Sequence, residues 1–290
     1  MFVKRFKYIL LLLLLISTPA FANTEIRYNE SLLPYKGGIL ISNYGTDSLH
    51  PKNDEFKGYI LYYKNRRLNE FIPAKGNLKA PTAMTVYQNK LFVCDRDKLW
   101  VYNLKNLNES PQKILFAPND KILNDIVLSK DELFVTTTDT NRIYKINLKS
   151  KILRPEKWID IPSPNGIAVR KDTIYIVSIP ADFTNVKEEN VIYVIKDKKN
   201  PVVEKFNTIP RMHDGIAVSK DGKALYVSDW NSSSVISVDV KTKEEKTVYH
   251  KGGLTPTDIF LKGNKLLIPD ELHHRVIIYN LKNHKEEVIR

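Results

Sequence analysis

The stretch PNGIAVRKDTIYIVS (164–178) contains the pattern that decides the fold of this 290-residue chain. A polar and a small residue precede a short apolar strand, a hairpin follows, and a second apolar strand ends in a polar residue. Alternation of Val, Ile and Tyr with other residues is typical of β-strands. The pattern recurs as PTAMTVYQNKLFVCD (81–95), LNDIVLSKDELFVTT (123–137), HDGIAVSKDGKALYVSD (213–229), PTDIFLKGNKLLIPD (256–270) and, more weakly, ESLLPYKGGILISN (30–43).

The repeats predict the architecture. Each one continues into a third strand, as at 142–148, and often into a fourth, as at 246–250. No twelve-residue window has a helical period. Six repeats of about 45 residues with four strands each are typical of a propeller. We therefore predict an all-β, six-bladed β-propeller with about four antiparallel strands per blade. Which terminus supplies the strand that closes the ring stays open.

The first residues predict export. Three basic residues lie within the first seven positions, an apolar run covers 8–16, and Ala20-Phe21-Ala22 follows. This order is typical of a secretory signal peptide, and the run is too short to span a bilayer in the mature protein. We expect residues 1–22 to be removed. Residues 23–290 would then form one periplasmic or secreted propeller domain without a membrane span.

Composition bears on the partners. The formal net charge is +12, but the basic residues are spread over turns and outer strands. Binding of single-stranded nucleic acid needs basic clusters interleaved with aromatic residues, and the sequence has none. We expect a small-molecule ligand or substrate and no nucleic acid. The single cysteine, Cys94, has no disulfide partner in the chain and is expected to be a small apolar residue in a strand.

Propeller geometry indicates which residues converge. The first strand of each blade lies innermost and begins at one mouth of the central channel, and the second strand returns to that mouth. The residues that start the first strands should therefore form a ring. Counting back thirteen residues from the end of each second strand, with an allowance for the longer hairpin of blade five, identifies this ring as Glu30, Thr82, Asn124, Asn165, Asp214 and Thr257.

The ring is rich in oxygen donors. Two members carry carboxylates and two carry amides, a set that suits a hard divalent cation. We expect Ca²⁺, with Mg²⁺ or Zn²⁺ as alternatives. Any single Asn-Gly or Asp-Gly pair is more often a turn, but four oxygen donors at one register are harder to explain in that way. Three further residues are expected at the mouth, namely Ile122, His213 and Trp230.

Two insertions follow second strands, at 44–57 and 179–190. Both should project from the ringed face. Long loops in compact folds are usually functional or disordered. We expect them to form a lid over the mouth, the alternative being a mobile surface loop.

At these positions the chain resembles the family of gluconolactonase, regucalcin (senescence marker protein) and luciferin-regenerating enzyme. The resemblance is carried by Glu30-Ser31, Leu123-Asn124-Asp125, Pro164-Asn165-Gly166 and Asp214-Gly215. It implies a six-bladed propeller with one divalent cation in the channel, held by Glu30, Asn165 and Asp214. It also implies that Asn124 contacts the metal or the substrate and that Asp214 acts as general base. Sugar-lactonase members tend to have Arg where this chain has Ile122, which speaks against a sugar lactone.

Two functions follow as hypotheses. The first is an exported, metal-dependent hydrolase of a lactone or related ester, in which the cation polarises the carbonyl and activates water. The alternative is a non-catalytic exported propeller that binds a ligand or a protein and holds a structural cation. The order Glu, Asn, Asn, Asp favours the enzyme, whereas Ile122 weakens that case. Fold alone does not decide between them.

Overall fold

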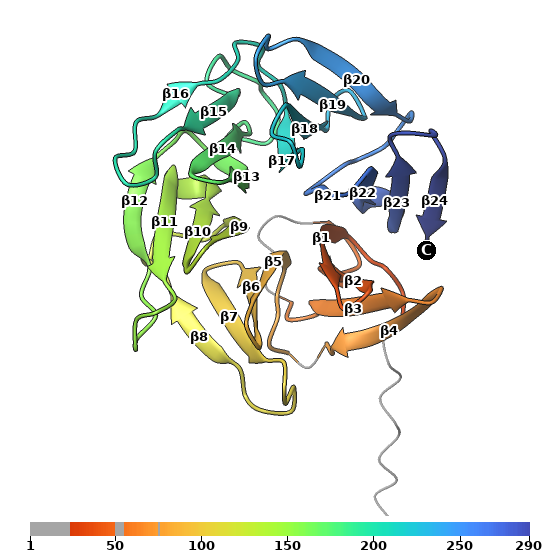
Figure 1. Cartoon of the computed structure of the whole chain (residues 1–290). Helices are drawn as coiled ribbons and strands as arrows, with labels where there is room; N and C mark the ends of the chain where they lie inside the picture. The colour runs from red at the N-terminus through yellow and green to blue at the C-terminus, as the bar shows by residue number, and fades with distance from the viewer. Residues whose placement is uncertain (1–23, 50–54, 75) are drawn as a thin grey trace, which may run out of the picture.

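A computed structural model describes residues 24–49, 55–74 and 76–290. Its strands form six four-stranded sheets arranged around a central channel (Figure 1). The predicted six-bladed β-propeller is therefore confirmed. The signal peptide expected at 1–22 lies outside the described residues. Within the described ranges, no helix has the length and apolar character needed to cross a membrane.

Each blade is an antiparallel meander whose strands pair in chain order. Blade one contains β1 (Asn29–Tyr35), β2 (Gly38–Asn43), β3 (Tyr59–Lys64) and β4 (Arg67–Ile72). Blade two contains β5 (Pro81–Tyr87), β6 (Lys90–Asp95), β7 (Lys98–Asn103) and β8 (Gln112–Leu115). Blade three contains β9 (Leu123–Ser129), β10 (Glu132–Thr137), β11 (Arg142–Asn147) and β12 (Glu156–Asp160), with a 3₁₀ turn, η1, at Thr138–Thr140.

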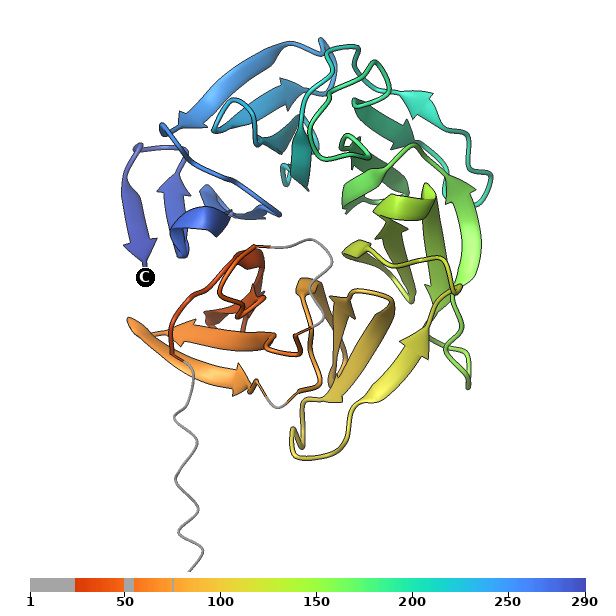
Figure 2. The same cartoon turned by 180° about the vertical axis from the view of Figure 1, so that it is seen from behind.

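The second half repeats this plan, as the view from behind also shows (Figure 2). Blade four contains β13 (Pro164–Arg170), β14 (Thr173–Ser178), β15 (Ile192–Ile195) and β16 (Glu204–Lys205). Blade five contains β17 (His213–Val218), β18 (Ala224–Asp229), β19 (Ser234–Asp239) and β20 (Glu245–His250). Blade six contains β21 (Phe260–Lys262), β22 (Lys265–Asp270), β23 (Arg275–Asn280) and β24 (Glu286–Ile289), with a 3₁₀ turn, η2, at Glu271–His273.

The hydrophobic core is divided among the blade interfaces. Each of six apolar clusters joins residues of two neighbouring blades. Second strands such as β2 are buried along their whole length, because both of their faces are covered. Cys94 is buried in the cluster between blades two and three and is a free thiol, as expected for a small core residue.

Among the residues that the structure describes, the ring closes without an exchanged strand, which answers the question the sequence left open. Blade one consists of β1–β4 and blade six of β21–β24, so each terminus completes its own sheet. An apolar cluster that includes Ile41 and Val276 fills the seam between the two blades. The Asn29 side chain adds a hydrogen bond by donating to the Arg275 carbonyl oxygen at 3.0 Å.

Every inner strand is interrupted near the channel mouth. In blade four, Pro164 pairs with Ser178 and Ile167 with Ile176, so that Asn165 and Gly166 stand opposite a single residue. Such a β-bulge bends the strand and re-aims its side chains. The six ring residues all lie in interruptions of this kind. The gap is widest in blade six, which is why β21 is short.

Hydroxyl groups on the second strands support these bulges. The Thr136 hydroxyl accepts a hydrogen bond from the Asp125 N–H at 2.9 Å and donates to the Asn165 carbonyl oxygen at 2.7 Å. Ser228 makes the equivalent pair of bonds between blades five and six. One hydroxyl therefore satisfies a bulge N–H and ties it to the neighbouring blade, which keeps the ring of side chains in register.

The glycines of the bulges allow the inner strands to approach one another. A Cβ on Gly166 would lie 2.5 Å from the Asp214 carbonyl oxygen, and a Cβ on Gly215 would clash with the backbone at Asp258. The Asn165-Gly166 and Asp214-Gly215 pairs thus lie within β13 and β17 and are not turns.

Candidate functional site

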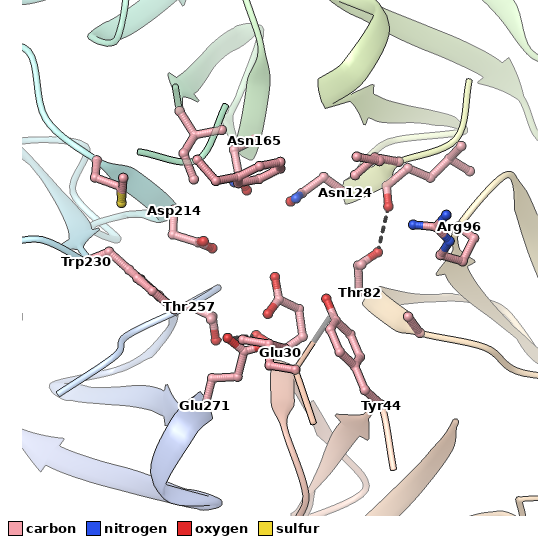
Figure 3. A pocket seen from close by; sticks show the side chains of 17 residues that line it. Glu30, Tyr44, Thr82, Arg96, Asn124, Asn165, Asp214, Trp230, Thr257 and Glu271 are labelled. Atoms are coloured by element: carbon pink, nitrogen blue, oxygen red, sulfur yellow. Dashed lines mark hydrogen bonds between the residues drawn. The ribbon is translucent and has the colours of Figure 1, made fainter. Parts of the chain in front are cut away.

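A cavity of about 150 Å³ opens at the channel mouth, and side chains from all six blades line it (Figure 3). The six ring residues are all among them, as are Ile122 and Trp230. The other lining residues are Tyr44, Leu49, Ala80, Arg96, Leu123, Ile179, Phe183, Met212 and Glu271. The bulge register therefore brings residues more than 200 positions apart in the chain to one small volume.

His213 is the exception among the residues expected at the mouth. It does not line the cavity, although Asp214 beside it does. Neighbouring residues of a strand point to opposite sides, and the His213 ring is completely buried. Burial lowers its pKa to about 4, so the imidazole is neutral at pH 7. The structure places it behind the wall of the site.

The hydroxyl groups of the two ring threonines hold neighbouring blades together. Thr82 donates to the Leu123 carbonyl oxygen at 2.9 Å, and Thr257 donates to the Glu30 carbonyl oxygen at 2.8 Å. Each bond joins the inner strands of neighbouring blades. A ligand would have to compete with these bonds to use either hydroxyl as a donor.

A second column of residues completes the cavity wall. These residues share one position, directly after the second strand of a blade: Tyr44, Arg96, Ile179, Trp230 and Glu271. Of these, sequence analysis singled out only Trp230. The signal was present, because counting one residue beyond each second strand finds the others.

Arg96 supplies a positive charge to the mouth from blade two. It adopts a left-handed conformation with φ of 59° after β6. Its carbonyl oxygen accepts a hydrogen bond from the Leu123 N–H at 2.7 Å, which holds it against the segment that carries Ile122 and Asn124. An arginine thus lines the site although position 122 is apolar.

Five carboxyl groups are buried in and beneath the cavity. Glu30, Asp214 and Glu271 line it, while Asp125 and Asp258 follow ring residues in their bulges. Burial, with a contribution from Asp125, raises the pKa of Asp214 to about 7. Burial, with a contribution from Asp214, raises the pKa of Glu271 to about 8. Burial raises the pKa values of Glu30 and Asp258 well above the usual range.

Three of these carboxyls have neighbours that bear on their roles. The Glu30 and Glu271 carboxyl groups lie close enough for each to affect the pKa of the other, and a hydrogen bond between them would need a proton on one of them. Asp125 accepts hydrogen bonds from the N–H groups of Ile126 at 2.6 Å and Ile167 at 2.7 Å. Asp125 therefore joins blades three and four, and burial raises its pKa to about 6.

The two insertions contribute to the wall. Phe183, from the second insertion, lines the cavity and is 36% exposed. The Asp182 carboxylate accepts hydrogen bonds from the N–H groups of Thr184 and Asn185, which shapes this loop. Leu49 comes from the first insertion, of which residues 50–54 are not described. That both loops close over the site as a lid stays a prediction.

The side chains at the mouth carry the kind of oxygen ligand that a hard cation prefers. Asp214 Oδ1 is buried and has no hydrogen-bond partner in the described part of the chain. An orphaned buried oxygen calls for an explanation such as an ion. Asn165 and Asn124, which each carry an amide oxygen, line the same cavity. Within the described ranges, no three His, Cys, Asp or Glu side chains form a ready-made metal site, so a cation here would also use amide oxygens and water. Such a donor set suits Ca²⁺ better than Zn²⁺.

Comparisons with known proteins support the propeller fold but do not assign the chain to a family. No family model and no curated protein matches the chain by sequence. Among solved structures, a chain of the nidogen/laminin complex is similar at a TM-score of 0.66 and 14% identity, and the match covers 89% of this chain and 92% of that chain. A streptogramin B lyase is similar at 0.54 and 13%, covering 72% and 67% of the two chains. Virginiamycin B lyase from Staphylococcus aureus is similar at 0.53 and 16%, covering 72% and 69%. At these identities the likeness shows the propeller fold alone.

Proposed function

We propose that the cavity is the active site of a hydrolase that opens a lactone or cleaves a related small ester with the help of a divalent cation, Ca²⁺ in the first place. One observation carries the proposal: a buried Asp214 carboxyl, with one oxygen unpartnered, lies among further oxygen donors at the channel mouth. A group with a pKa of about 7 is suited to proton transfer at neutral pH.

Asp214 would act as the base and then as the acid. Its carboxylate accepts a proton from a water molecule while the water oxygen bonds to the carbonyl carbon of the substrate. The carbonyl π electrons move to the carbonyl oxygen and then return, and the bond to the ester oxygen breaks. The departing oxygen takes the proton from Asp214. The products are a carboxylic acid and an alcohol, which in a lactone remain on one molecule.

Glu30, Asn165 and Asp214 would hold the cation. When bound, it would polarise the carbonyl and favour ionisation of water. Glu271 lies close enough to hydrogen-bond to Glu30 and would orient that carboxylate. The amide group of Asn124 would donate to the substrate and position it. Apolar side chains around the mouth, such as Phe183 and Met212, would keep bulk water from the reacting groups.

The test uses purified residues 23–290. Elemental analysis should find about one divalent cation per chain, and a panel of lactones and esters should show turnover that a chelator removes. The product should gain the mass of one water, which separates hydrolysis from an elimination that leaves the mass unchanged. No turnover of any panel member with saturating cation would overturn the enzyme and favour the ligand-binding alternative.

The proposal includes export, because residues 1–22 have the features of a signal peptide. When the full chain is expressed, N-terminal sequencing of the product should begin at Asn23. Cell fractionation should find the product outside the cytoplasm. A chain that retains Met1 and stays in the cytoplasm would contradict this part of the proposal.

A further inference from the structure

We infer that the hydroxyl group of Tyr44 binds the carbonyl oxygen of the substrate and stabilises the negative charge that develops on this oxygen when water adds to the carbonyl carbon. The hydroxyl donates a hydrogen bond and keeps its proton throughout. The inference assigns a role in the proposed reaction and so rests on the proposed function. Its test includes binding of an unreactive carbonyl compound, so that it can fail or succeed separately from catalysis.

The first support is the direction in which the Tyr44 side chain points. Tyr44 directly follows β2 of blade one, and its ring extends into the cavity (Figure 3). In this view the hydroxyl lies between Glu30 and Thr82 and across the cavity from Asp214. A substrate held between the two walls would therefore have Tyr44 on one side and the proposed base on the other.

The second support is that the Tyr44 hydroxyl has no hydrogen-bond partner among the residues that the structure describes. Tyr44 is only 9% exposed, and the hydroxyl of a buried tyrosine usually has a partner. Tyr144, by comparison, donates to the Asp120 carboxylate at 2.7 Å. An oxygen atom of a ligand in the cavity would supply the partner that Tyr44 lacks.

The third support is the state of the other donors in the lining. Besides Tyr44, the described lining residues with a hydroxyl are Thr82 and Thr257, and both donate to backbone carbonyls. The indole nitrogen of Trp230 is buried out of reach of water. Among the lining hydroxyls that the structure describes, that of Tyr44 is therefore the one open to a ligand.

The fourth support is the charge around the site. Three carboxyl groups line the cavity together with Tyr44, namely those of Glu30, Asp214 and Glu271. Burial, followed by the charges of these carboxyls, raises the pKa of Tyr44 well above its usual range, so the hydroxyl keeps its proton at neutral pH. The same carboxyls would repel a negative charge that forms on a carbonyl oxygen. A hydrogen-bond donor aimed at that oxygen offsets part of this repulsion in the transition state.

Backbone hydrogen bonds fix the position of Tyr44. Its N–H donates to the Tyr28 carbonyl oxygen at 3.1 Å, and the Gly45 N–H donates to the Arg27 carbonyl oxygen at 3.3 Å. Both bonds tie the end of β2 to the segment that precedes β1. A donor that is already in place needs no reorganisation when the reaction occurs.

Kinetic measurements on Tyr44→Phe test the inference, because this substitution removes the hydroxyl and keeps the ring. We expect kcat to fall on the order of 10²-fold with little change in KM, since the bond strengthens as charge develops. Tyr62→Phe is the matched control, because it removes another hydroxyl of blade one, which donates to the Lys36 carbonyl oxygen outside the cavity. It should keep wild-type kinetics. A wild-type kcat in Tyr44→Phe would overturn the inference and leave the proposed hydrolase intact.

Infrared spectroscopy of a bound lactam tests the same contact without catalysis. δ-Valerolactam has the ring and the carbonyl group of a lactone but resists hydrolysis, and a hydrogen bond to its carbonyl oxygen lowers the C=O stretching frequency. The measurement uses protein in chelator, so that a cation does not contribute. We expect a lower frequency on the wild-type protein and on Tyr62→Phe than on Tyr44→Phe. Should Tyr44→Phe fail to fold, Tyr44→Met, which also lacks the hydroxyl, takes its place.

The outcomes separate the inference from the proposed function. A frequency difference between the wild-type protein and Tyr44→Phe supports the inference even when no lactone or ester is hydrolysed. Equal frequencies, or no binding of the lactam to the wild-type protein, overturn it.

Discussion

The carboxyl groups of Glu30 and Glu271 lie close enough for each to affect the pKa of the other, although one residue belongs to the first blade and the other to the last. Glu30 lies in the bulge of β1, and Glu271 begins the 3₁₀ turn η2 that follows β22. Their contact lies on the seam where the ring closes. Two carboxylates this close repel each other, so a proton on one of them or a bound cation would lower the free-energy cost of bringing them together.

The raised pKa values of these buried carboxyls make the free energy of unfolding fall as the pH rises. The folded-state pKa values of Asp214 and Glu271 lie at about 7 and about 8, above those of unfolded chains. The stabilisation from their protonated forms is complete below about pH 4. It is lost as the pH rises through the folded-state values.

We predict that protein stripped of divalent cations melts at progressively lower temperature from pH 5 to pH 8. Addition of Ca²⁺ should raise the melting temperature more at pH 8 than at pH 5, because the cation competes with protons for the same oxygens. Thermal melts at four pH values, with and without Ca²⁺, measure both effects. A melting temperature that rises over this window in the stripped protein would contradict the prediction.

Asp214→Asn should lose hydrolytic activity far more than stability. Asn retains an oxygen and nearly the same shape but does not accept a proton at neutral pH, and loss of a general base costs on the order of 10²–10⁴ in rate. Denaturant unfolding at pH 7 should show no decrease in the free energy of unfolding, because the substitution replaces a buried ionisable carboxyl by a neutral amide. Asp239→Asn, at an exposed turn, is the control and should keep full activity. Wild-type turnover in Asp214→Asn would remove Asp214 from the mechanism.

Asn124→Ala should lower turnover less than Asp214→Asn does, because it removes a positioning group and leaves the base in place. Asn124 is 9% exposed and lines the cavity. Steady-state kinetics of the two variants on the same substrate make the comparison. A loss from Asn124→Ala as large as that from Asp214→Asn would give Asn124 a larger role than we assign.

Ile122→Arg tests substrate class. We predict that it raises turnover of glucono-δ-lactone from a low or absent wild-type level, since Ile122 lines the cavity where an added guanidinium would reach a sugar. Comparison of kcat/KM for the sugar lactone and for an aryl lactone in both proteins measures the change. An unaltered ratio would show that position 122 does not select the substrate.

Thr257→Val should destabilise the closing seam. The Thr257 hydroxyl donates to the Glu30 carbonyl oxygen at 2.8 Å, and valine has almost the same volume without a donor. We expect the free energy of unfolding to fall by about 1 kcal/mol or slightly more, because the buried Glu30 carbonyl loses its hydrogen-bond donor. Urea unfolding measures it, and Thr82→Val should behave alike because it breaks the equivalent bond to Leu123. An unchanged midpoint would show that the bond is energetically neutral.

Repetition in the sequence was sufficient to predict the blades. Alternating strands with a hairpin at constant spacing, as in 164–178, predict the same local structure wherever they occur. Register along each repeat also identified the ring, since Asn165 and Asp214 lie at equivalent positions in blades four and five. These features depend on contacts within a blade, which the local pattern encodes.

Contacts between blades were decided only by the tertiary structure. Glu30 and Glu271 affect each other's pKa although they lie more than 200 positions apart, and no local pattern connects them. The mode of closure, in which each terminus completes its own sheet, depends on how the seam packs. The raised pKa of Asp214 follows from its burial beside Asp125 of another blade. The sequence by itself determined the six ring side chains that face the channel, whereas the packing of six blades around it decided how deeply they are buried and which charges they meet.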